Sequence, residues 1–148
     1  YAYAVDWDLD GDVDVISASA IYGEANLWEQ LRFDTFSSTT EISDVLDEIY
    51  DDSTQFFITS LDLDKDGLPD LLVGSEAKSM RVLHRHQTDS FTVQSGESSP
   101  FDGISLSVRT IPFAVDWDGD GDLDIVLGRD ADSSAGTSAD VALYLNED

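Results

Sequence analysis

Three short segments of the chain place aspartates in one repeated pattern. Each has the form apolar-D-x-D-x-D-G-x-x-D-apolar-apolar, and the three loops begin at Asp6, Asp62 and Asp116. Counting the first aspartate as position 1, aspartates occupy positions 1, 3, 5 and 9, and glycine occupies position 6. Alternating carboxylates around a tight turn can direct several oxygens to one point, and Ca²⁺ takes about six to eight oxygen ligands. The pattern therefore predicts about three calcium ions per chain.

Each loop position has an expected role in this chemistry. The aspartates at positions 1, 3 and 5 would turn their carboxylates toward the ion, and the position-9 aspartate would close the shell from the far side. Position 7 would offer only its carbonyl oxygen, so its side chain can vary. Glycine at position 6 permits the positive φ of a sharp turn. The candidate metal ligands are Asp6, Asp8, Asp10, Asp12, Asp14, Asp62, Asp64, Asp66, Leu68, Asp70, Asp116, Asp118, Asp120, Asp122 and Asp124.

Other interpretations of the acidic loops fit less well. An EF-hand loop needs glutamate at position 12 and a helix on either side. Position 12 is Ser17, Val73 or Leu127 here, and the flanking segments have the character of strands. Mg²⁺ keeps its waters and prefers octahedral geometry, so a carboxylate-dense loop favours Ca²⁺. A merely solvated acidic turn would not require the same spacing and the same glycine three times.

The elements that position these loops are short apolar runs. An apolar run leads into each loop, a second follows it directly, and a third comes later. Runs this short, rich in β-branched residues and bounded by Gly and Asp, predict buried strands. A unit of about 55 residues with three or four strands has the size of a β-propeller blade. We predict an all-β fold of about three blades, as a single repeat domain 1–148 with units of approximately 1–55, 56–109 and 110–148.

The segments between the units differ from one another. In residues 41–50, apolar side chains recur at Ile42, Val45, Leu46 and Ile49, which is a helical period. We predict a short helical insertion there. Residues 94–103 and 129–140 are rich in small and polar residues and are predicted to be loops.

Two further pairs of residues could do chemistry. Trp7 and Trp117 occupy loop position 2, pointing away from the ion, where they could stack on sugars or pack against a neighbouring blade. We favour packing. His84 and His86 would share one face of a strand, because side chains two apart point the same way. A transition-metal pair needs a third ligand, and none is evident in the sequence, so we expect an exposed strand face.

Composition excludes several classes of function. The 148 residues include 7 Lys+Arg and 32 Asp+Glu, a formal net charge of −25. This charge disfavours nucleic-acid partners, whose affinity depends on cationic side chains, and anionic membrane surfaces. It also destabilises a compact state by self-repulsion, so the chain should work in high salt or bind cations. There is no cysteine, and the apolar runs are too short to insert in a membrane.

The third loop resembles a known family most clearly. Residues 116–128, D-W-D-G-D-G-D-L-D-I-V-L-G, and 143–146, L-Y-L-N, are similar to the FG-GAP/VCBS repeats of integrin alpha chains and many secreted proteins. The other two units depart from the later motif, with Trp28 and Gln30 in one and His84 and His86 in the other. The resemblance implies a calcium-binding β-propeller, with each loop between adjacent strands of a blade, and an extracellular or cell-surface location.

No catalytic motif accompanies these loops, so no enzyme is predicted. We expect a calcium-binding propeller module for adhesion or for binding protein or glycan. Two alternatives stay open: a structural subunit of a surface layer or filament that binds copies of itself, and an accessory propeller of a secreted carbohydrate-active enzyme. Closed propellers have about four to eight blades, so we expect the chain to be an excerpt of a larger one.

Overall fold

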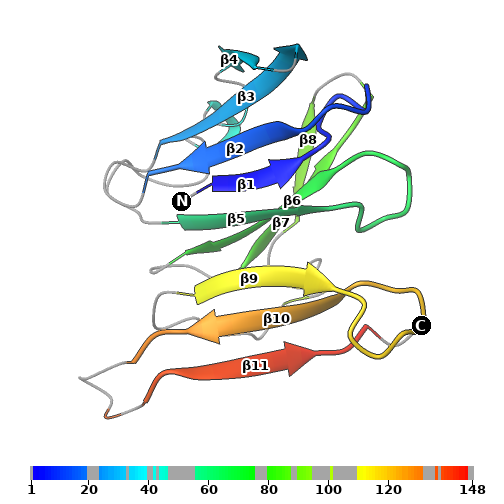
Figure 1. Ribbon diagram of the computed structural model, residues 1–148. Helices are drawn as coiled ribbons and strands as arrows, with labels where there is room; N and C mark the ends of the chain where they lie inside the picture. The colour runs from blue at the N-terminus through cyan, green and yellow to red at the C-terminus, as the bar shows by residue number, and fades with distance from the viewer. Residues whose placement is uncertain are drawn as a thin grey trace.

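The chain folds into antiparallel sheets in the computed structural model (Figure 1). The structure describes residues 2–19, 24–32, 34–39, 42, 44–46, 56–75, 80–87, 90–94, 101, 110–131, 136 and 138–146. Within these ranges there are 11 strands in three sheets, two of four strands and one of three. The prediction of an all-β fold is therefore confirmed.

Every sheet is a simple meander, in which each strand pairs with the one before it in the chain. The strands are β1 (Ala2–Val5), β2 (Asp14–Ala18), β3 (Ala25–Arg32) and β4 (Thr35–Thr39) in the first sheet, β5 (Phe56–Leu61), β6 (Asp70–Ser75), β7 (Arg81–Arg85) and β8 (Phe91–Gln94) in the second, and β9 (Thr110–Val115), β10 (Asp124–Arg129) and β11 (Asp140–Tyr144) in the third. The three aspartate loops are the β1–β2, β5–β6 and β9–β10 connections. All three lie along the same side of the molecule, at the right in Figure 1.

Two apolar clusters join the sheets face to face. The cluster between the first and second sheets includes Ile16 and Leu27 from one side and Leu71 and Leu83 from the other. The cluster between the second and third sheets includes Leu72 from the second sheet, and Ile125 and Leu127 from the third. Successive side chains of β6 point to opposite faces, so the middle sheet is buried on both. Burial on both faces explains why the sequence of β6 is a continuous apolar run and not an alternating one.

Contacts of Trp7, at position 2 of the first loop, also hold the first two sheets together. The guanidinium of Arg85, on β7, donates to the carbonyl oxygen of Trp7 and lies 4.3 Å from the centroid of the Trp7 ring. Phe91, on β8, stacks on the same ring with centroids 6.2 Å apart. Trp7 is 1% exposed, so the prediction that it packs against the neighbouring sheet is confirmed.

The segments predicted as a helix and as loops are described only in part. Ile42 and residues 44–46 are helical, and the rest of the predicted segment 41–50 lies outside the described residues. Ile42 and Leu46 are fully buried in the cluster between the first two sheets. In the predicted loop 94–103, Phe101 occupies a turn and is 7% exposed, packed into the second cluster.

Gly74 is a point of close approach between the second and third sheets. A Cβ added there would lie 2.8 Å from the carbonyl oxygen of Thr110 and 3.1 Å from a ring carbon of Pro112, both on β9. We therefore expect Gly74→Ala to push the sheets apart and to lower the free energy of unfolding by about 1–3 kcal/mol, the usual effect of overpacking. Urea denaturation monitored by tryptophan fluorescence measures this change.

The matched control is Gly128→Ala. Gly128 occupies the same place in the third sheet, but there the added Cβ would meet only the carbonyl oxygen of Ile111, at 3.9 Å. We expect no loss at Gly128, because the alanine has room and restricts the unfolded chain. Equal losses in the two variants would show that close packing at Gly74 is not what matters.

Candidate metal centres

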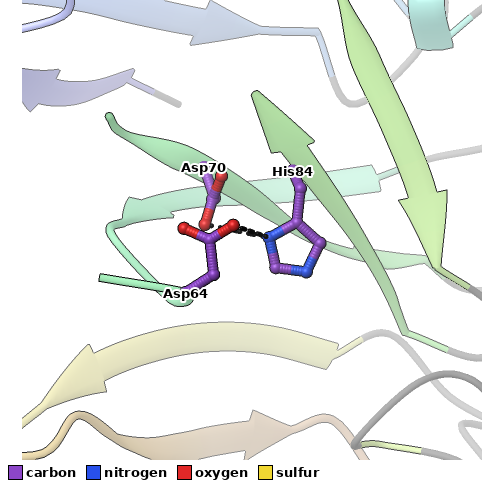
Figure 2. Close-up of side chains that lie close together, drawn as sticks. All are labelled: Asp64, Asp70 and His84. Atoms are coloured by element: carbon purple, nitrogen blue, oxygen red, sulfur yellow. Dashed lines mark hydrogen bonds and ion pairs between the residues drawn. The ribbon is translucent and has the colours of Figure 1, made fainter. Parts of the chain in front are cut away.

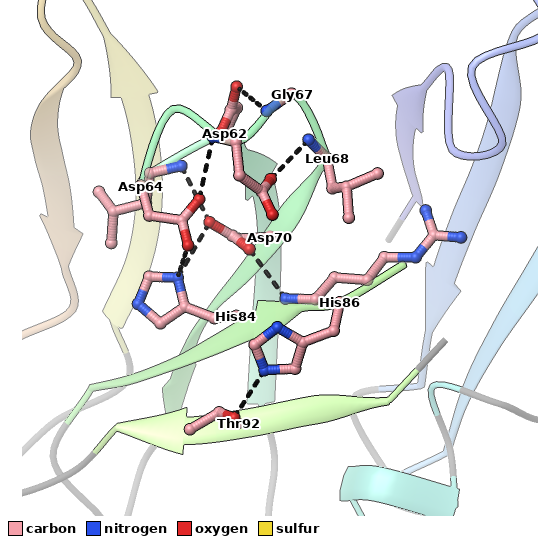
Figure 3. A network of polar contacts seen from close by, with 11 residues as sticks. Asp62, Asp64, Gly67, Leu68, Asp70, His84, His86 and Thr92 are labelled. Carbon is pink, nitrogen blue, oxygen red and sulfur yellow. Dashed lines mark hydrogen bonds and ion pairs between the residues drawn. The ribbon is translucent and has the colours of Figure 1, made fainter. Parts of the chain in front are cut away.

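The three aspartate loops share one set of internal hydrogen bonds. In the second loop, Asp62 Oδ2 accepts from the backbone N–H of Gly67 at 3.0 Å (Figure 3), Asp64 Oδ1 from Asp66 at 3.2 Å, and Asp66 Oδ1 from Leu68 at 2.8 Å. The same three bonds, from position 6 to 1, 5 to 3 and 7 to 5, occur in the first loop and in the third. In all three loops, these bonds hold the backbone in a tight turn around the aspartate side chains.

The backbone of each loop adopts a positive φ at two positions. At position 6 the φ values are 93° for Gly11, 90° for Gly67 and 97° for Gly121, as the sequence predicts. Position 4 is left-handed as well, with φ of 62° at Leu9 and 61° at Lys65, whereas the third loop has Gly119 there at 82°. In the sequence pattern, position 4 is variable and carries no conformational signal. A non-glycine residue in this conformation costs about 1–2 kcal/mol, so the first two loops carry strain that the third avoids.

Each loop brings three of its four expected aspartates together. Candidate ligand atoms lie within 4.8 Å of one another in three groups, each from one loop: Asp6, Asp8 and Asp10; Asp62, Asp64 and Asp66; Asp116, Asp118 and Asp124. The position-7 side chains stay outside these groups, and that of Asp122 forms an ion pair with Lys65 of the second loop. This contact links two neighbouring loops, although an exposed pair contributes little to stability.

Two carboxylate oxygens fit a cation particularly well. Asp6 Oδ1 and Asp62 Oδ1 are buried and accept no hydrogen bond within the described part of the chain. In the third loop the corresponding atom, Asp116 Oδ1, accepts from the backbone N–H of Gly119 at 2.7 Å. A buried, unsatisfied charged oxygen is costly, and a metal ion is one of the few partners that can satisfy it. The residues present therefore fit a hard cation held by oxygen ligands.

Electrostatics within the loops also favour a cation. Desolvation raises the pKa of Asp8 and of Asp118 against one backbone hydrogen bond each, and the charges of neighbouring aspartates raise it further. Backbone hydrogen bonds from Asn146 and Trp117 instead hold the pKa of Asp124 below its usual value. A divalent ion would stabilise the charged forms of the crowded carboxylates.

The position-9 aspartates have a second role that the sequence analysis missed. Asp14, Asp70 and Asp124 are 1%, 0% and 1% exposed, and each begins the strand after its loop. In each loop, Oδ2 of this aspartate accepts from the backbone N–H of position 2, at 2.7, 2.9 and 2.7 Å. Its Oδ1 accepts from a backbone N–H in or just after the third strand of the sheet, at 2.8, 2.9 and 2.9 Å; the donors are Gln30, Arg85 and Asn146. These aspartates therefore tie the loop to the sheet.

The histidines do not lie as expected. His84 is 7% exposed, with Nδ1 3.2 Å from Asp70 Oδ2 and 3.5 Å from Asp64 Oδ2. The predicted exposed strand face is therefore wrong for His84, because the second loop folds over it. His86 follows the end of β7 and is exposed, with Nε2 2.7 Å from Thr92 Oγ1. The predicted packing is also wrong for Trp117, which is 62% exposed because it lies in the loop of the last described sheet.

The comparisons with known proteins agree with the architecture. The FG-GAP-like repeat matches residues 6–73 and again residues 62–127, and each match starts at a first loop aspartate and runs through the next loop. The chain belongs to this family of β-rich repeat modules. Neither the search of curated proteins nor that of solved structures found a significant match. In the described part of the chain, no helix has the length and apolar character needed to cross a bilayer.

Proposed function

We propose that the chain is an extracellular calcium-binding module in which each loop holds one structural Ca²⁺. The observation that carries this proposal is the pair of buried carboxylate oxygens, Asp6 Oδ1 and Asp62 Oδ1, which have no hydrogen-bond partner among the described residues. The side chains at positions 1, 3, 5 and 9 would hold the ion, together with the carbonyl oxygen of position 7. The ions would offset about six of the 25 net negative charges.

Calcium in these loops would act on the fold itself. Each loop joins the first two strands of a sheet, and its position-9 aspartate also reaches the third. Fixing a loop therefore fixes three strands, so binding energy becomes folding energy. The affinity expected of extracellular modules is of order 10⁻⁴–10⁻³ M, which such compartments saturate.

We also propose that the three sheets are successive blades of a β-propeller. Three features support this: each sheet is a sequential meander, the sheets pack face to face, and the aspartate loops lie on one side (Figure 1). The module would bind a protein or glycan and would not be an enzyme. A glycan array probed in calcium and in chelator tests the ligand class. Calcium-dependent signals would support a glycan ligand, and an empty array would move the proposal to a protein ligand.

A specific surface favours a second candidate, a structural subunit that assembles with copies of itself. In each sheet, residues paired across three neighbouring strands form a row on one face. Equivalent rows in the first and second sheets are Tyr3, Ile16 and Leu27, and Thr59, Leu72 and Val82. Of these residues, Ile16, Leu27, Leu72 and Val82 are fully buried against the next sheet. The equivalent row of the third sheet is Phe113–Val126–Leu143, in which Phe113 is 54% and Leu143 40% exposed. The third sheet thus presents the contact surface of a blade.

The first sheet offers a complementary surface on its outer face. Its row Ala4–Val15–Trp28 occupies the place that Ser60–Leu71–Leu83 has in the second sheet, and Leu71 and Leu83 pack against the first sheet. Head-to-tail contact between the third sheet of one copy and the first sheet of another would repeat the contacts already made within the chain. Two copies would then give six blades, within the usual range of about four to eight.

Substitution of Phe113 tests this assembly. We expect the wild-type chain in calcium to associate as its concentration rises, and Phe113→Asp to remain monomeric, because a carboxylate would be buried in the contact. Light scattering coupled to gel filtration measures the mass. Val93→Asp is the control, because Val93 is 37% exposed but lies on the edge strand β8 of the middle sheet. Association that persists in Phe113→Asp would exclude this contact, and a monomeric wild type would leave the ligand-binding module as the better proposal.

A further inference from the structure

The second loop differs from the other two in the residue that faces it from the third strand. In each unit, the N–H that meets Oδ1 of the position-9 aspartate belongs to Gln30, Arg85 or Asn146. The residue just before this one is therefore equivalent in the three units: Glu29 in the first, His84 in the second and Leu145 in the third. An imidazole is available at the second loop alone among these three places.

The imidazole of His84 is directed at two loop carboxylates (Figure 2). Its Nδ1 lies 3.2 Å from Asp70 Oδ2 and 3.5 Å from Asp64 Oδ2, and one donor atom from each residue falls within a common 4.8 Å. His84 and Asp70 are 7% and 0% exposed, so packing fixes both side chains. With metal–ligand distances of about 2.1 Å, the two separations correspond to ligand–metal–ligand angles of roughly 100–115°, close to the tetrahedral value.

The ligand types select a different kind of ion from that expected elsewhere. Imidazole nitrogen suits Zn²⁺, Ni²⁺ and similar first-row ions, whereas carboxylate, carbonyl and water oxygens suit Ca²⁺ and Mg²⁺. One nitrogen and two carboxylate oxygens leave room for solvent or a further loop oxygen. Asp70 Oδ2 also accepts the N–H of Leu63 at 2.9 Å and keeps a second lone pair for a metal.

We propose that the second loop is a mixed nitrogen–oxygen site that binds a first-row divalent transition ion through His84 Nδ1, Asp64 and Asp70. Because Asp64 also belongs to the carboxylate group with Asp62 and Asp66, a transition ion would compete with Ca²⁺ there. The first and third loops, which lack a histidine, would keep their preference for Ca²⁺. This inference goes beyond the calcium proposal, and it stands on the geometry of His84 whether or not calcium fills the other loops.

The chain has few other side chains that could bind a transition ion through nitrogen or sulfur. The chain has no cysteine and two histidines, and His86 is exposed and hydrogen-bonded to Thr92 outside the cluster (Figure 3). The variants are His84→Leu, which places at the second loop the residue that the third unit has at Leu145, and the matched control His86→Leu. The full chain is titrated with Zn²⁺ by calorimetry and with Co²⁺ by visible absorption, in excess calcium throughout.

We expect the wild-type chain and His86→Leu to bind one Co²⁺ or Zn²⁺ with the same affinity, and His84→Leu to bind at least about tenfold more weakly, as loss of one ligand predicts. Equal affinity in His84→Leu, equal weakening in His86→Leu, or no transition-ion binding by the wild type would each overturn the proposal. So would about three equivalent Co²⁺ ions per chain, because the loops without histidine would then bind as well as the second.

A second measurement covers the case in which His84→Leu does not fold. In the wild-type chain with labelled histidine, diamagnetic Zn²⁺ should shift the imidazole resonances of His84 at one equivalent and change those of His86 far less. Unchanged His84 resonances would contradict the proposal without any variant. Calcium stoichiometry, measured without transition ions, reports separately on the calcium proposal, so failure of one proposal does not imply failure of the other.

Discussion

Removal of calcium should lower the melting temperature of the chain by at least about 10 °C. With three sites of affinity near 10⁻⁴–10⁻³ M, 10 mM calcium stabilises the folded state by about 4–8 kcal/mol. That is a large share of the stability of a typical domain, and each kcal/mol corresponds to about 2–4 °C at this size. The physical reason is the crowding of carboxylates, of which Asp6 Oδ1 and Asp62 Oδ1 are buried without a hydrogen-bond partner in the described structure. Circular dichroism melts in calcium and in chelator measure the shift.

Two controls separate bound calcium from general screening. Sodium chloride at matched ionic strength screens the net charge of −25 but does not satisfy the loop oxygens, so it should recover only part of the loss. Mg²⁺ should also recover less than Ca²⁺, because it gives up its waters reluctantly. The same melting temperature in calcium and in chelator, at equal ionic strength, would contradict the proposal that the ions stabilise the fold.

Asp14→Ala should destabilise the chain even without calcium, whereas Asp8→Ala should not. Asp14 is buried and accepts from the N–H groups of Trp7 and Gln30 at 2.7 and 2.8 Å. Hydrogen bonds to a charged group contribute about 1.5–3 kcal/mol each, so we expect a loss of about 3 kcal/mol or more in chelator. Asp8 accepts one exposed bond, from Asp10 at 3.1 Å, and desolvation and its neighbours' charges raise its pKa. Its removal in chelator should change the free energy of unfolding by less than about 1 kcal/mol.

The comparison depends on measuring both variants in both conditions. In calcium each should be less stable than the wild type, because each would remove a ligand. Asp14→Asn keeps the size and one acceptor oxygen, and it gives a measurable intermediate if Asp14→Ala does not fold. Equal losses for Asp8→Ala and Asp14→Ala in chelator, from urea denaturation, would show that the position-9 aspartate has no structural role beyond metal binding.

The sequence predicted the loops because their shape depends on local spacing. Alternating aspartates and the position-6 glycine determine which carboxylates converge, and apolar runs such as 71–74 predict the strands on either side. Nothing non-local is needed for either conclusion. For that reason the structure brings three of the four expected aspartates of each loop within reach of one another: positions 1, 3 and 5 in the first two loops, and positions 1, 3 and 9 in the third.

The features that the sequence did not reveal depend on contacts between distant segments. Asp70 meets the N–H of Arg85, 15 positions away, and the same fold of the sheet brings His84 against Asp64. Two histidines two apart predict a shared strand face, but not what covers it. Trp7 and Trp117 occupy the same loop position, yet one is buried and the other exposed, because a sheet packs against the first loop, whereas none of the described sheets packs against the third. The sequence did show that the second unit departs from the L-Y-L-N motif with two histidines, but it aligned His86 with Asn146, whereas the structure makes Arg85 the equivalent residue.

Calorimetric titration of the full chain with calcium tests whether the aspartate loops bind the ion. We expect about three ions for the wild type, about two for Asp118→Ala, which removes a candidate ligand of the third loop, and about three for Asp34→Ala, an exposed acidic residue outside the loops. Absence of calcium binding by the wild type, or the same stoichiometry and affinity in Asp118→Ala, would contradict this expectation.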